Sequence, residues 1–495
     1  MFEAAELEHE ISKEDYKKEE AELRRALLQA QRELGAQRRF PVLILIAGIE
    51  GAGKSETVHL LNEWMDPRFI EVTGFAIPTD EEAAHPPMWR FWRALPPKGR
   101  IGVFFGAWQT MPILERVLGG LSAGDFAARM EEIIRLERML AQEGVLLIKY
   151  WFHLSKGQQK KRIKALEKDK ETSWKVTRYD RKLFEYYDDF IEVCEPFLRE
   201  TSTGEAPWTV VPAANERHRA LFVGRHLLAT IRARLDAQEA PAAKPAKPKP
   251  AVPDKVNVIR ALTLKQEMSR DEYDEALAEA QGRLARATRH KIYGKLSGIA
   301  VFEGNDAAGK GGAVRRLGAA LDPRAYRIVP VAAPTEEERA QPYLWRFWRQ
   351  VPRPGRLTIF DRSWYGRVLV ERVEGFAPEA DWRRAYAEIN DFEEQLVAHG
   401  AVVAKFWLAI SKDEQFRRFK EREATPFKQH KITEEDWRNR EKWDAYEAAV
   451  CEMVERTSTG LAPWTLVEAD NKLHARVKVI STLADMVEAG LKRVK

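Results

Sequence analysis

Apolar residues along the chain form two copies of one pattern, in which short apolar runs alternate with longer amphipathic segments. The runs lie at 42–47, 101–105 and 145–152 in the first half and at 298–303, 357–360 and 402–408 in the second. Short runs of this kind predict strands buried on both faces of a parallel sheet. The helix-length segments between them predict helices over both faces. We therefore expect a doubly wound α/β fold in each half.

The segments that flank the two halves predict the domain organisation. A charged, Leu/Ala-rich segment with helical spacing precedes each half, at 14–34 and at 271–287, and predicts an amphipathic helix. Residues 237–253 read AQEAPAAKPAKPKPAVP, which cannot bury a core and predicts an extended spacer. We expect an N-terminal domain at 1–236, a flexible linker at 237–255 and a C-terminal domain at 256–495.

Three rare strings occur twice at one fixed spacing, which indicates an internal duplication. WRFWR begins at Trp89 and Trp345, STG-x-APWT at Ser202 and Ser458, and a glycine-rich loop at Gly48 and Gly304. The members of each pair are 256 residues apart. WRFWR is the same in both copies, so we interpret it as packing rather than chemistry.

Composition narrows the class of protein. The chain has 495 residues with 44% hydrophobic residues, enough for real cores, and its two cysteines lie in no metal or disulfide pattern. The formal net charge is only +5, so we expect no nucleic-acid partner. The N-terminus is polar and acidic, and no apolar run approaches the roughly 20 residues that cross a bilayer. We expect a cytoplasmic protein without a membrane partner.

The loop of the second half has the spacing of a phosphate-binding P-loop. It reads GNDAAGKGG from Gly304, directly after a predicted strand and before a predicted helix. Glycines let backbone N–H groups turn toward phosphate oxygens, and the helix N-terminus and the lysine add positive charge. The predicted phosphate-binding residues of the loop are Gly304, Asn305, Ala308, Gly309, Lys310 and Gly311.

Two carboxylates are candidates for a magnesium site beside this loop. Gly311 stands where an ordinary P-loop has a Ser or Thr that binds magnesium, so another ligand is needed. Asp306 lies inside the loop, and Asp361 ends the next apolar run. Carboxylate oxygens at strand ends are suitable Mg²⁺ ligands. The alternative for Asp361 is a turn cap after the strand.

The first half has the better P-loop string but lacks the other groups. Its loop from Gly48 reads GIEGAGKS, whereas FGAWQTM at 105–111 aligns with DRSWYGR at 361–367. The carboxylate and both arginines are therefore missing. We interpret the first half as catalytically inactive, with anion binding, folding or dimerisation left open as its role.

A basic run follows the third apolar run of the second half. It contains Arg417, Arg418, Lys420, Arg422, Lys428 and Lys431. Such a run on a helix is often a solvated face, and the alternative is a lid that closes over phosphates and excludes water. The first half has Leu166 and Thr172 in place of Arg422 and Lys428, which favours the lid.

These motifs together resemble the second family of polyphosphate kinases, in its two-domain form that phosphorylates AMP. The signatures are GNDAAGKGG, APTEEE, FDRSWYGR with VERV, SKDEQFRRF and APW, and they span nearly the whole chain. The resemblance implies tandem P-loop kinase-like domains with helical lids and Mg²⁺-dependent transfer from polyphosphate to AMP. The residues implied to carry the site are Asp306, Lys310, Asp361, Arg362, Arg367 and the lid.

One departure from the family pattern and two alternative functions accompany this interpretation. The family often has K-x-W-K in the lid, whereas this chain has KQHK at 428–431, so the role of His430 is open. An ATP-dependent nucleotide kinase and a non-catalytic polyphosphate-binding protein are the alternative functions. The sequence also leaves open a homo-oligomer through a sheet edge or a helix face.

Overall fold

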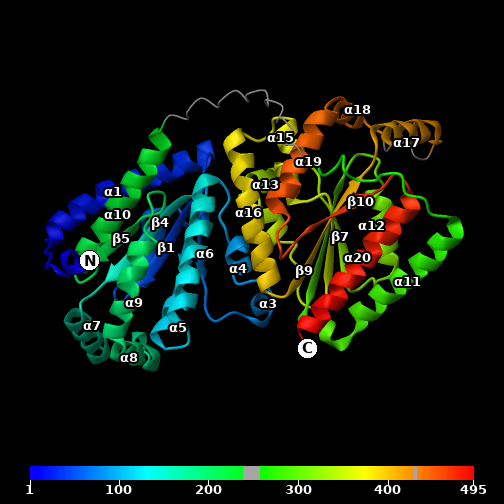
Figure 1. The fold of residues 1–495 in the computed structure, drawn as a ribbon. Helices are drawn as coiled ribbons and strands as arrows, with labels where there is room; N and C mark the ends of the chain where they lie inside the picture. Colours follow the sequence, from blue (N-terminus) through cyan, green and yellow to red (C-terminus); the bar gives the residue numbers. More distant parts are fainter. Residues whose placement is uncertain (238–256, 427–431, 495) are drawn as a thin grey trace. The chain divides into compact units, whose positions relative to one another are not determined.

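The computed structural model describes residues 1–237, 257–426 and 432–494, which form two compact units (Figure 1). The first unit comprises Met1–Pro78, Arg90–Gln238 and Pro334–Trp345. The second comprises Thr79–Trp89, Glu239–Ala333 and Arg346–Lys495. Each unit contains one five-stranded parallel sheet.

The first sheet has the strand order β2-β3-β1-β4-β5, with every neighbouring pair parallel. Its strands are β1 (Val42–Gly48), β2 (Ile70–Gly74), β3 (Ile101–Phe105), β4 (Leu146–His153) and β5 (Trp208–Pro212). β1 is central, and Val42 is aligned with Ile101 of β3 and Leu146 of β4. This register brings the C-terminal end of β1, where the loop begins, beside the end of β3.

The second sheet repeats this topology, with the order β7-β8-β6-β9-β10. Its strands are β6 (Ser297–Gly304), β7 (Tyr326–Pro330), β8 (Leu357–Asp361), β9 (Ala401–Ala409) and β10 (Trp464–Glu468). Phe302 of β6 is aligned with Asp361 of β8 and Phe406 of β9. The ends of the three central strands therefore meet at one edge, where the glycine-rich loop begins.

Helices connect the strands in both halves of the chain. The first half has η1 (Glu3–Glu6), α1 (Lys13–Gln37), α2 (Lys54–Trp64), η2 (Pro67–Phe69), α3 (Asp80–Ala83), α4 (Trp89–Arg93), α5 (Thr110–Val117), α6 (Ala123–Gln142), α7 (Lys156–Lys168), η3 (Ser173–Lys175), α8 (Arg178–Glu185), α9 (Tyr187–Glu200) and α10 (Glu216–Asp236). The second half has α11 (Arg270–Arg289), η4 (Lys291–Lys295), α12 (Lys310–Ala319), α13 (Glu336–Arg339), α14 (Trp345–Trp348), η5 (Trp364–Arg367), α15 (Val370–Val373), α16 (Glu379–Ala398), α17 (Lys412–Ala424), α18 (Glu434–Glu441), α19 (Trp443–Thr457) and α20 (Lys472–Arg493).

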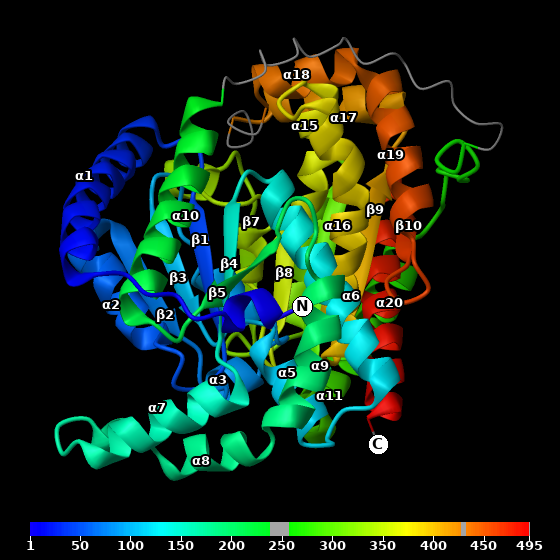
Figure 2. The same cartoon turned by 90° about the vertical axis from the view of Figure 1, so that its left-hand side faces the viewer.

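The helices cover both faces of each sheet. In the first unit α1, α2 and α10 lie on one face and α5, α6 and α9 on the other (Figure 2). In the second unit α11, α12 and α20 lie on one face and α16 with α19 on the other (Figure 1). The predicted leader helices are present as α1 and α11, and each packs along the last helix of its half, α10 or α20.

The cores explain the apolar runs of the sequence. Ile359 of β8, Phe406 of β9 and Val479 of α20 are completely buried in one cluster. The WRFWR string packs as predicted, because Trp348 is 1% exposed and its ring lies 4.8 Å from that of Phe392. Among the helices of the described residues, none is long and apolar enough to span a membrane.

The predicted α/β fold and its duplication are confirmed, and the sheets are larger than the sequence predicted. The three predicted strands of each half are the central ones. The strands missed by the sequence pattern are the edges β2, β5, β7 and β10. In β2 and β7 no residue is fully buried, so these strands lack the continuous apolar run that marks a central strand.

Each unit contains a completely buried lysine that pairs with a glutamate. In the second unit, Lys405 of β9 donates hydrogen bonds to Glu393 Oε2 at 2.7 Å and to the Thr457 carbonyl at 2.7 Å. In the first unit, Lys149 of β4 donates to Glu137 Oε2 at 2.6 Å and to the Thr201 carbonyl at 2.7 Å. A buried ion pair needs such additional partners, because both charges have lost their hydration.

Candidate active site

The glycine-rich loop of the second half connects β6 to α12. Gly304 ends the strand with a φ of 147°, and a Cβ there would lie 2.4 Å from the Leu408 carbonyl oxygen, so only glycine fits. Lys310 begins the helix and folds back, and its Nζ donates to the carbonyls of Gly304 at 2.7 Å and Asn305 at 3.3 Å. Removal of this ammonium from water lowers the pKa of Lys310. These two hydrogen bonds hold the Lys310 ammonium beside the first residues of the loop.

Asp306 is fixed from three directions. Arg362 Nη2 donates to Asp306 Oδ1 at 3.2 Å, and Asn439 Nδ2 donates to Oδ2 at 2.9 Å. Gln415 Nε2 donates to the Asp306 backbone carbonyl at 3.1 Å. Two residues distant in sequence therefore orient the carboxylate, and a third holds the backbone of Asp306.

Asp361 and Arg362 follow each other at the end of β8. No described side chain donates a hydrogen bond to the Asp361 carboxylate, and this charge lies near Lys310 and Arg362. Arg362 has a left-handed backbone with φ 63°, which is unfavourable for a residue with a long side chain. The corresponding residue of the first half is Gly106, with φ 77°. The backbone turn is therefore shared, and the second half maintains it despite a side chain at this position.

A buried carboxyl lies directly beneath the loop. Glu303, the residue before Gly304, is 6% exposed, and its Oε1 accepts a hydrogen bond from Ser363 Oγ at 2.8 Å. Burial raises the pKa of Glu303, and the serine hydrogen bond opposes this shift. The Ser363 contact links β6 to the residues that follow β8.

Arg418 of α17 holds the loop in place. Its side chain is 2% exposed and donates to the carbonyls of Ala307 at 3.0 Å and Ala308 at 3.1 Å. Its other nitrogen donates to the carbonyls of Ala469 at 2.7 Å and Asp470 at 2.8 Å. This arginine belongs to the basic run that the sequence indicated as a lid. Its guanidinium, however, forms hydrogen bonds to the protein's own carbonyls.

The other predicted site residues differ in their placement. Asn305 lines the pocket, and its Oδ1 accepts a hydrogen bond from the backbone N–H of Ile410 at 3.2 Å. Arg367 Nε lies 2.8 Å from Glu371 Oε2, so Arg367 forms an ion pair with a residue only four positions later in the chain. Arg422 lies half-buried in the last turn of α17. Lys428, Lys431 and His430 fall outside the described residues.

A pocket of about 80 Å³ opens beside the loop. Its wall contains Asp306 and Arg362 together with polar and aromatic residues of α18 and α19, namely Asn439, Trp443 and Tyr446. The Tyr446 hydroxyl donates to Asn439 Oδ1 at 3.2 Å, and Asn439 in turn donates to Asp306. A chain of hydrogen bonds therefore connects Asp306 through α18 to α19. Burial raises the pKa of Tyr446, so it stays a neutral donor at neutral pH.

Sequence reasoning missed Glu303, Ser363, Asn439 and Tyr446. A signal for all four is present in the alignment of the two halves at the fixed spacing. The first half has Ala47, Ala107, Leu183 and Phe190 at these positions. These four polar side chains are thus absent from the half that also lacks Asp361, whereas Gln415 and Asp306 keep polar counterparts there in Gln159 and Glu50.

Comparison with known proteins agrees with this geometry. The family model described as Polyphosphate kinase 2 (PPK2) matches residues 10–239 and again residues 267–495. A Pseudomonas aeruginosa protein named polyphosphate:AMP phosphotransferase is 59% identical over the whole of both chains. Proteins of the same name from Pseudomonas syringae pv. tomato and Acinetobacter johnsonii are 52% and 38% identical, over 100% and about 90% of each chain.

A solved structure supports the same relationship. The crystal structure of a Pseudomonas aeruginosa PA01 protein assigned to polyphosphate kinase 2 superimposes with a TM-score of 0.91, at 56% identity and with complete coverage of both chains. The resemblance drawn from the motifs is thereby confirmed. Two matches of the family model, one in each half, together with full-length relatives, show that this chain belongs to the polyphosphate kinase 2 family.

Proposed function

We propose that the protein transfers the terminal phosphoryl group of polyphosphate to AMP and so produces ADP, in the pocket of the second half. The observation that carries this proposal is that only the second half has the complete set of charged groups around its P-loop: Lys310, Asp306, Asp361 and Arg362. The names of the full-length relatives support the same donor and acceptor.

The arrangement suits a reaction between two polyanions. Donor and acceptor repel each other, so a site must supply positive charge where they meet. The Lys310 ammonium, the Arg362 guanidinium and the N-terminus of α12 converge on the loop. Because their pairing within the loop fixes their positions before substrate arrives, little reorganisation is needed during transfer.

Magnesium is the cation that fits these residues best. The described residues contain no cluster of three or more acidic, histidine or cysteine side chains that could hold a metal by themselves. Mg²⁺ is commonly held by one or two carboxylates together with water and substrate phosphates. Asp306 and Asp361 would supply those carboxylates, and the bound ion would neutralise charge on the phosphates.

The transfer itself requires no covalent enzyme intermediate. An oxygen of the AMP phosphate forms a bond to the terminal phosphorus of the chain, and the bond from that phosphorus to the bridging oxygen breaks. The shortened polyphosphate leaves with the electron pair of that bond. AMP phosphate is already largely ionised near neutral pH, so Asp306 is assigned to positioning rather than to proton removal.

The decisive experiment measures ADP formation from AMP, magnesium and long-chain polyphosphate without ATP. The two loop lysines provide a matched pair of variants, Lys310→Ala and Lys54→Ala. We expect Lys310→Ala to abolish activity and Lys54→Ala to preserve it. If the unmodified protein makes ADP only after ATP is added, the donor is wrong and the chain is an ATP-dependent nucleotide kinase.

The metal assignment has its own test. We expect Asp361→Asn to bind polyphosphate but to lose most of its turnover, with partial recovery at high magnesium concentration. An Asp361→Asn variant that phosphorylates AMP at the unmodified rate would exclude Asp361 as a metal ligand.

A further inference from the structure

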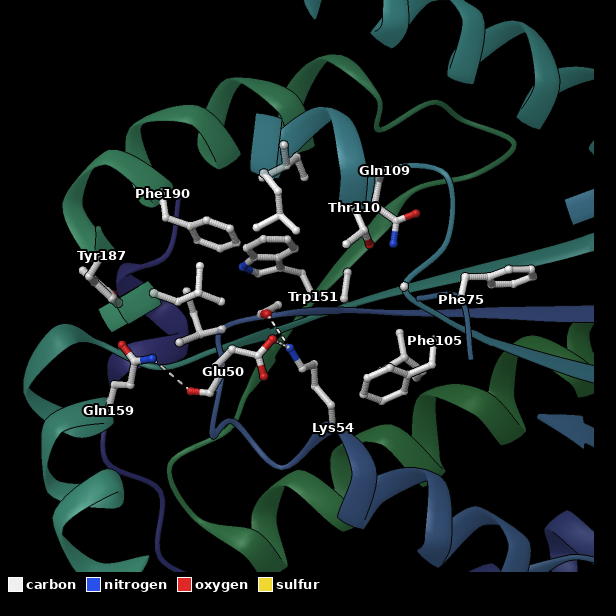
Figure 3. A pocket seen from close by; sticks show the side chains of 18 residues that line it. Glu50, Lys54, Phe75, Phe105, Gln109, Thr110, Trp151, Gln159, Tyr187 and Phe190 are labelled. Atoms are coloured by element: carbon white, nitrogen blue, oxygen red, sulfur yellow. Dashed lines mark hydrogen bonds and ion pairs between the residues drawn. The ribbon is translucent and has the colours of Figure 1, made fainter. Parts of the chain in front are cut away.

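The first half retains a pocket at the place where the second half has its active-site pocket. This first-half pocket has a volume of about 240 Å³, compared with about 80 Å³ in the second half. Apolar side chains form most of its wall, including Phe105, Ile113, Leu114, Leu183 and Phe190. Figure 3 shows Lys54 reaching from the start of α2 toward Glu50, with Trp151 and Phe190 across the pocket from them.

The lysine of this pocket is neutralised by the protein. Lys54 Nζ donates to Glu50 Oε1 at 2.7 Å and to the Gly48 carbonyl at 2.8 Å. In the second half the corresponding acid, Asp306, is held by Arg362 and Asn439 instead. The first half has Gly106 in place of Arg362, so its lysine and acid pair with each other and no second cation stands beside them at that position.

A second acid, Glu56, lies among the cations next to the loop and pairs with two of them. Glu56 stands where the second half has Gly312, and its Oε1 lies 3.5 Å from Arg162 and 3.6 Å from Lys175. Glu56 also interacts electrostatically with Arg219, whose Nη1 donates to the Ala213 carbonyl at 3.2 Å. Among the described residues that line the pocket itself, only Lys54 and Glu50 are charged, and because they pair with each other the wall offers no unpaired cation to a phosphate group.

Polar groups without partners lie in the same pocket wall. Gln109 is 1% exposed, and neither its Nε2 nor its Oε1 has a hydrogen-bond partner among the described residues. The buried Nε1 of Trp151 and Oε1 of Gln159 also lack partners there. An unpaired buried amide destabilises the folded state, whereas a ligand with a matching donor and acceptor would satisfy it.

Size and chemistry together indicate one class of ligand. An apolar cavity of about 150 Å³ holds a single benzene ring, so this larger pocket suits a planar two-ring system. Glutamine pairs through both amide atoms with the donor and acceptor edge of adenine, and aromatic side chains stack on bases. We propose that the first-half pocket binds the adenine ring of an unphosphorylated compound, with Gln109 as the pairing residue.

Calorimetric titration of the full chain with adenine, adenosine, AMP and indole tests this ligand class. We expect adenine or adenosine to bind the first-half pocket more tightly than AMP, and the comparison of the two distinguishes a free base from a nucleoside. Indole has two rings but no acceptor beside its donor, and we expect it to bind at least tenfold more weakly than adenine. Absence of adenine and adenosine binding, or equal binding of indole and adenine, would overturn the proposal.

Matched variants assign the binding to one half. Leu114→Trp fills the first-half pocket and Val370→Trp fills the same position of the second. We expect Leu114→Trp to abolish adenosine binding at the first-half pocket while AMP phosphorylation continues, and Val370→Trp to do the reverse. Because binding is measured directly, this result does not depend on which donor the second half uses. Adenosine binding that persists unchanged in Leu114→Trp would refute the assignment.

A second variant separates loss of pairing from loss of folding. Gln109→Leu removes the unpaired amide and keeps the side-chain size. We expect adenine binding to weaken by about tenfold or more while the melting temperature of the ligand-free protein stays the same or rises. Unchanged adenine affinity in Gln109→Leu would show that Gln109 does not recognise the ligand.

Discussion

Arg418 and Arg162 occupy the same position in the two halves and have different surroundings. The Arg418 side chain is 2% exposed and donates to four backbone carbonyls of the loop and of the segment after β10. The Arg162 side chain is 35% exposed, and its Nη2 lies 3.5 Å from Glu56 Oε1. The same substitution should therefore have very different consequences at the two positions.

We expect Arg418→Met to destabilise the second half strongly. The substitution leaves four carbonyls without their donor and removes one of the two arginines that pair with Glu414, and removal of one partner of a buried pair costs about 3–5 kcal/mol. For a unit of this size each kcal/mol lowers the melting temperature by about 2–4 °C, so the expected decrease is roughly 6–20 °C. Arg162→Met should cost less than about 1 kcal/mol, because exposed ion pairs contribute little.

Two measurements report on the second half specifically. Thermal inactivation of AMP phosphorylation follows its pocket, and hydrogen exchange of peptides within 297–320 follows β6, the loop and α12 independently of turnover. Arg418→Met should lower the inactivation temperature and accelerate exchange in these peptides, and Arg162→Met should change neither. If the two variants behave alike, the four hydrogen bonds of Arg418 do not stabilise the loop and the reasoning is wrong.

Three further predictions use other contacts. Lys405→Met and Lys149→Met should each destabilise their own half by about 3–5 kcal/mol in calorimetry, since each leaves a buried glutamate unpaired, and a large inequality would contradict a shared structural role. Asn439→Leu should reduce kcat for AMP phosphorylation at least tenfold with little change in melting temperature, because Asp306 loses a positioning contact; an unchanged kcat would refute this. Burial lowers the pKa of His153, so the unfolded chain binds a proton that the folded chain does not, and stability falls as the pH decreases below the unfolded value of 6.5. His153→Asn should reduce this dependence by up to about 1.4 kcal/mol per pH unit in urea unfolding between roughly pH 5 and 7, and an unaltered slope would contradict it.

The fold could be predicted where burial dictates sequence. Every residue of β9 is buried, and eight of its nine residues are apolar, the exception being Lys405 with its buried partner Glu393, so its run is visible in the sequence. In β7 no residue is fully buried, and Arg327 lies among its five residues. Edge strands of this kind have weak patterns, because only one neighbour and part of one face constrain their side chains. The sequence therefore identified the sheet centres and missed their edges.

The pocket could be predicted only where its residues are close in sequence or end a central strand. Lys310 and Asp306 belong to one contiguous loop, and Asp361 ends β8 beside it. Asn439 is 133 residues from Asp306, and the packing of α18 brings the two together. No local pattern marks such a residue, which resembles any polar position on a charged helix. The catalytic role of Arg367 stays a prediction, because its charge is paired with Glu371.

The two halves together show which interactions belong to the scaffold and which to the chemistry. The buried lysine, its glutamate and the tryptophan that donates to that glutamate are present in both halves, at 3.0 Å for Trp364 and for Trp108. Removal of one member of this set would leave a buried charge, so the fold retains all of them.

The residues around the loop acid, in contrast, are not shared by the two halves, and several of them differ together. The first half lacks both partners of the loop acid, with Gly106 and Leu183 in place of Arg362 and Asn439, and its acid, Glu50, pairs with Lys54. Because Glu50 has Lys54 as its partner, the loss of the arginine and the asparagine leaves no unpaired carboxylate at this loop and costs little stability. The first half can thus lose the charges needed for phosphoryl transfer without weakening its core, and the same replacements create an apolar pocket that is suited to a different, uncharged ligand.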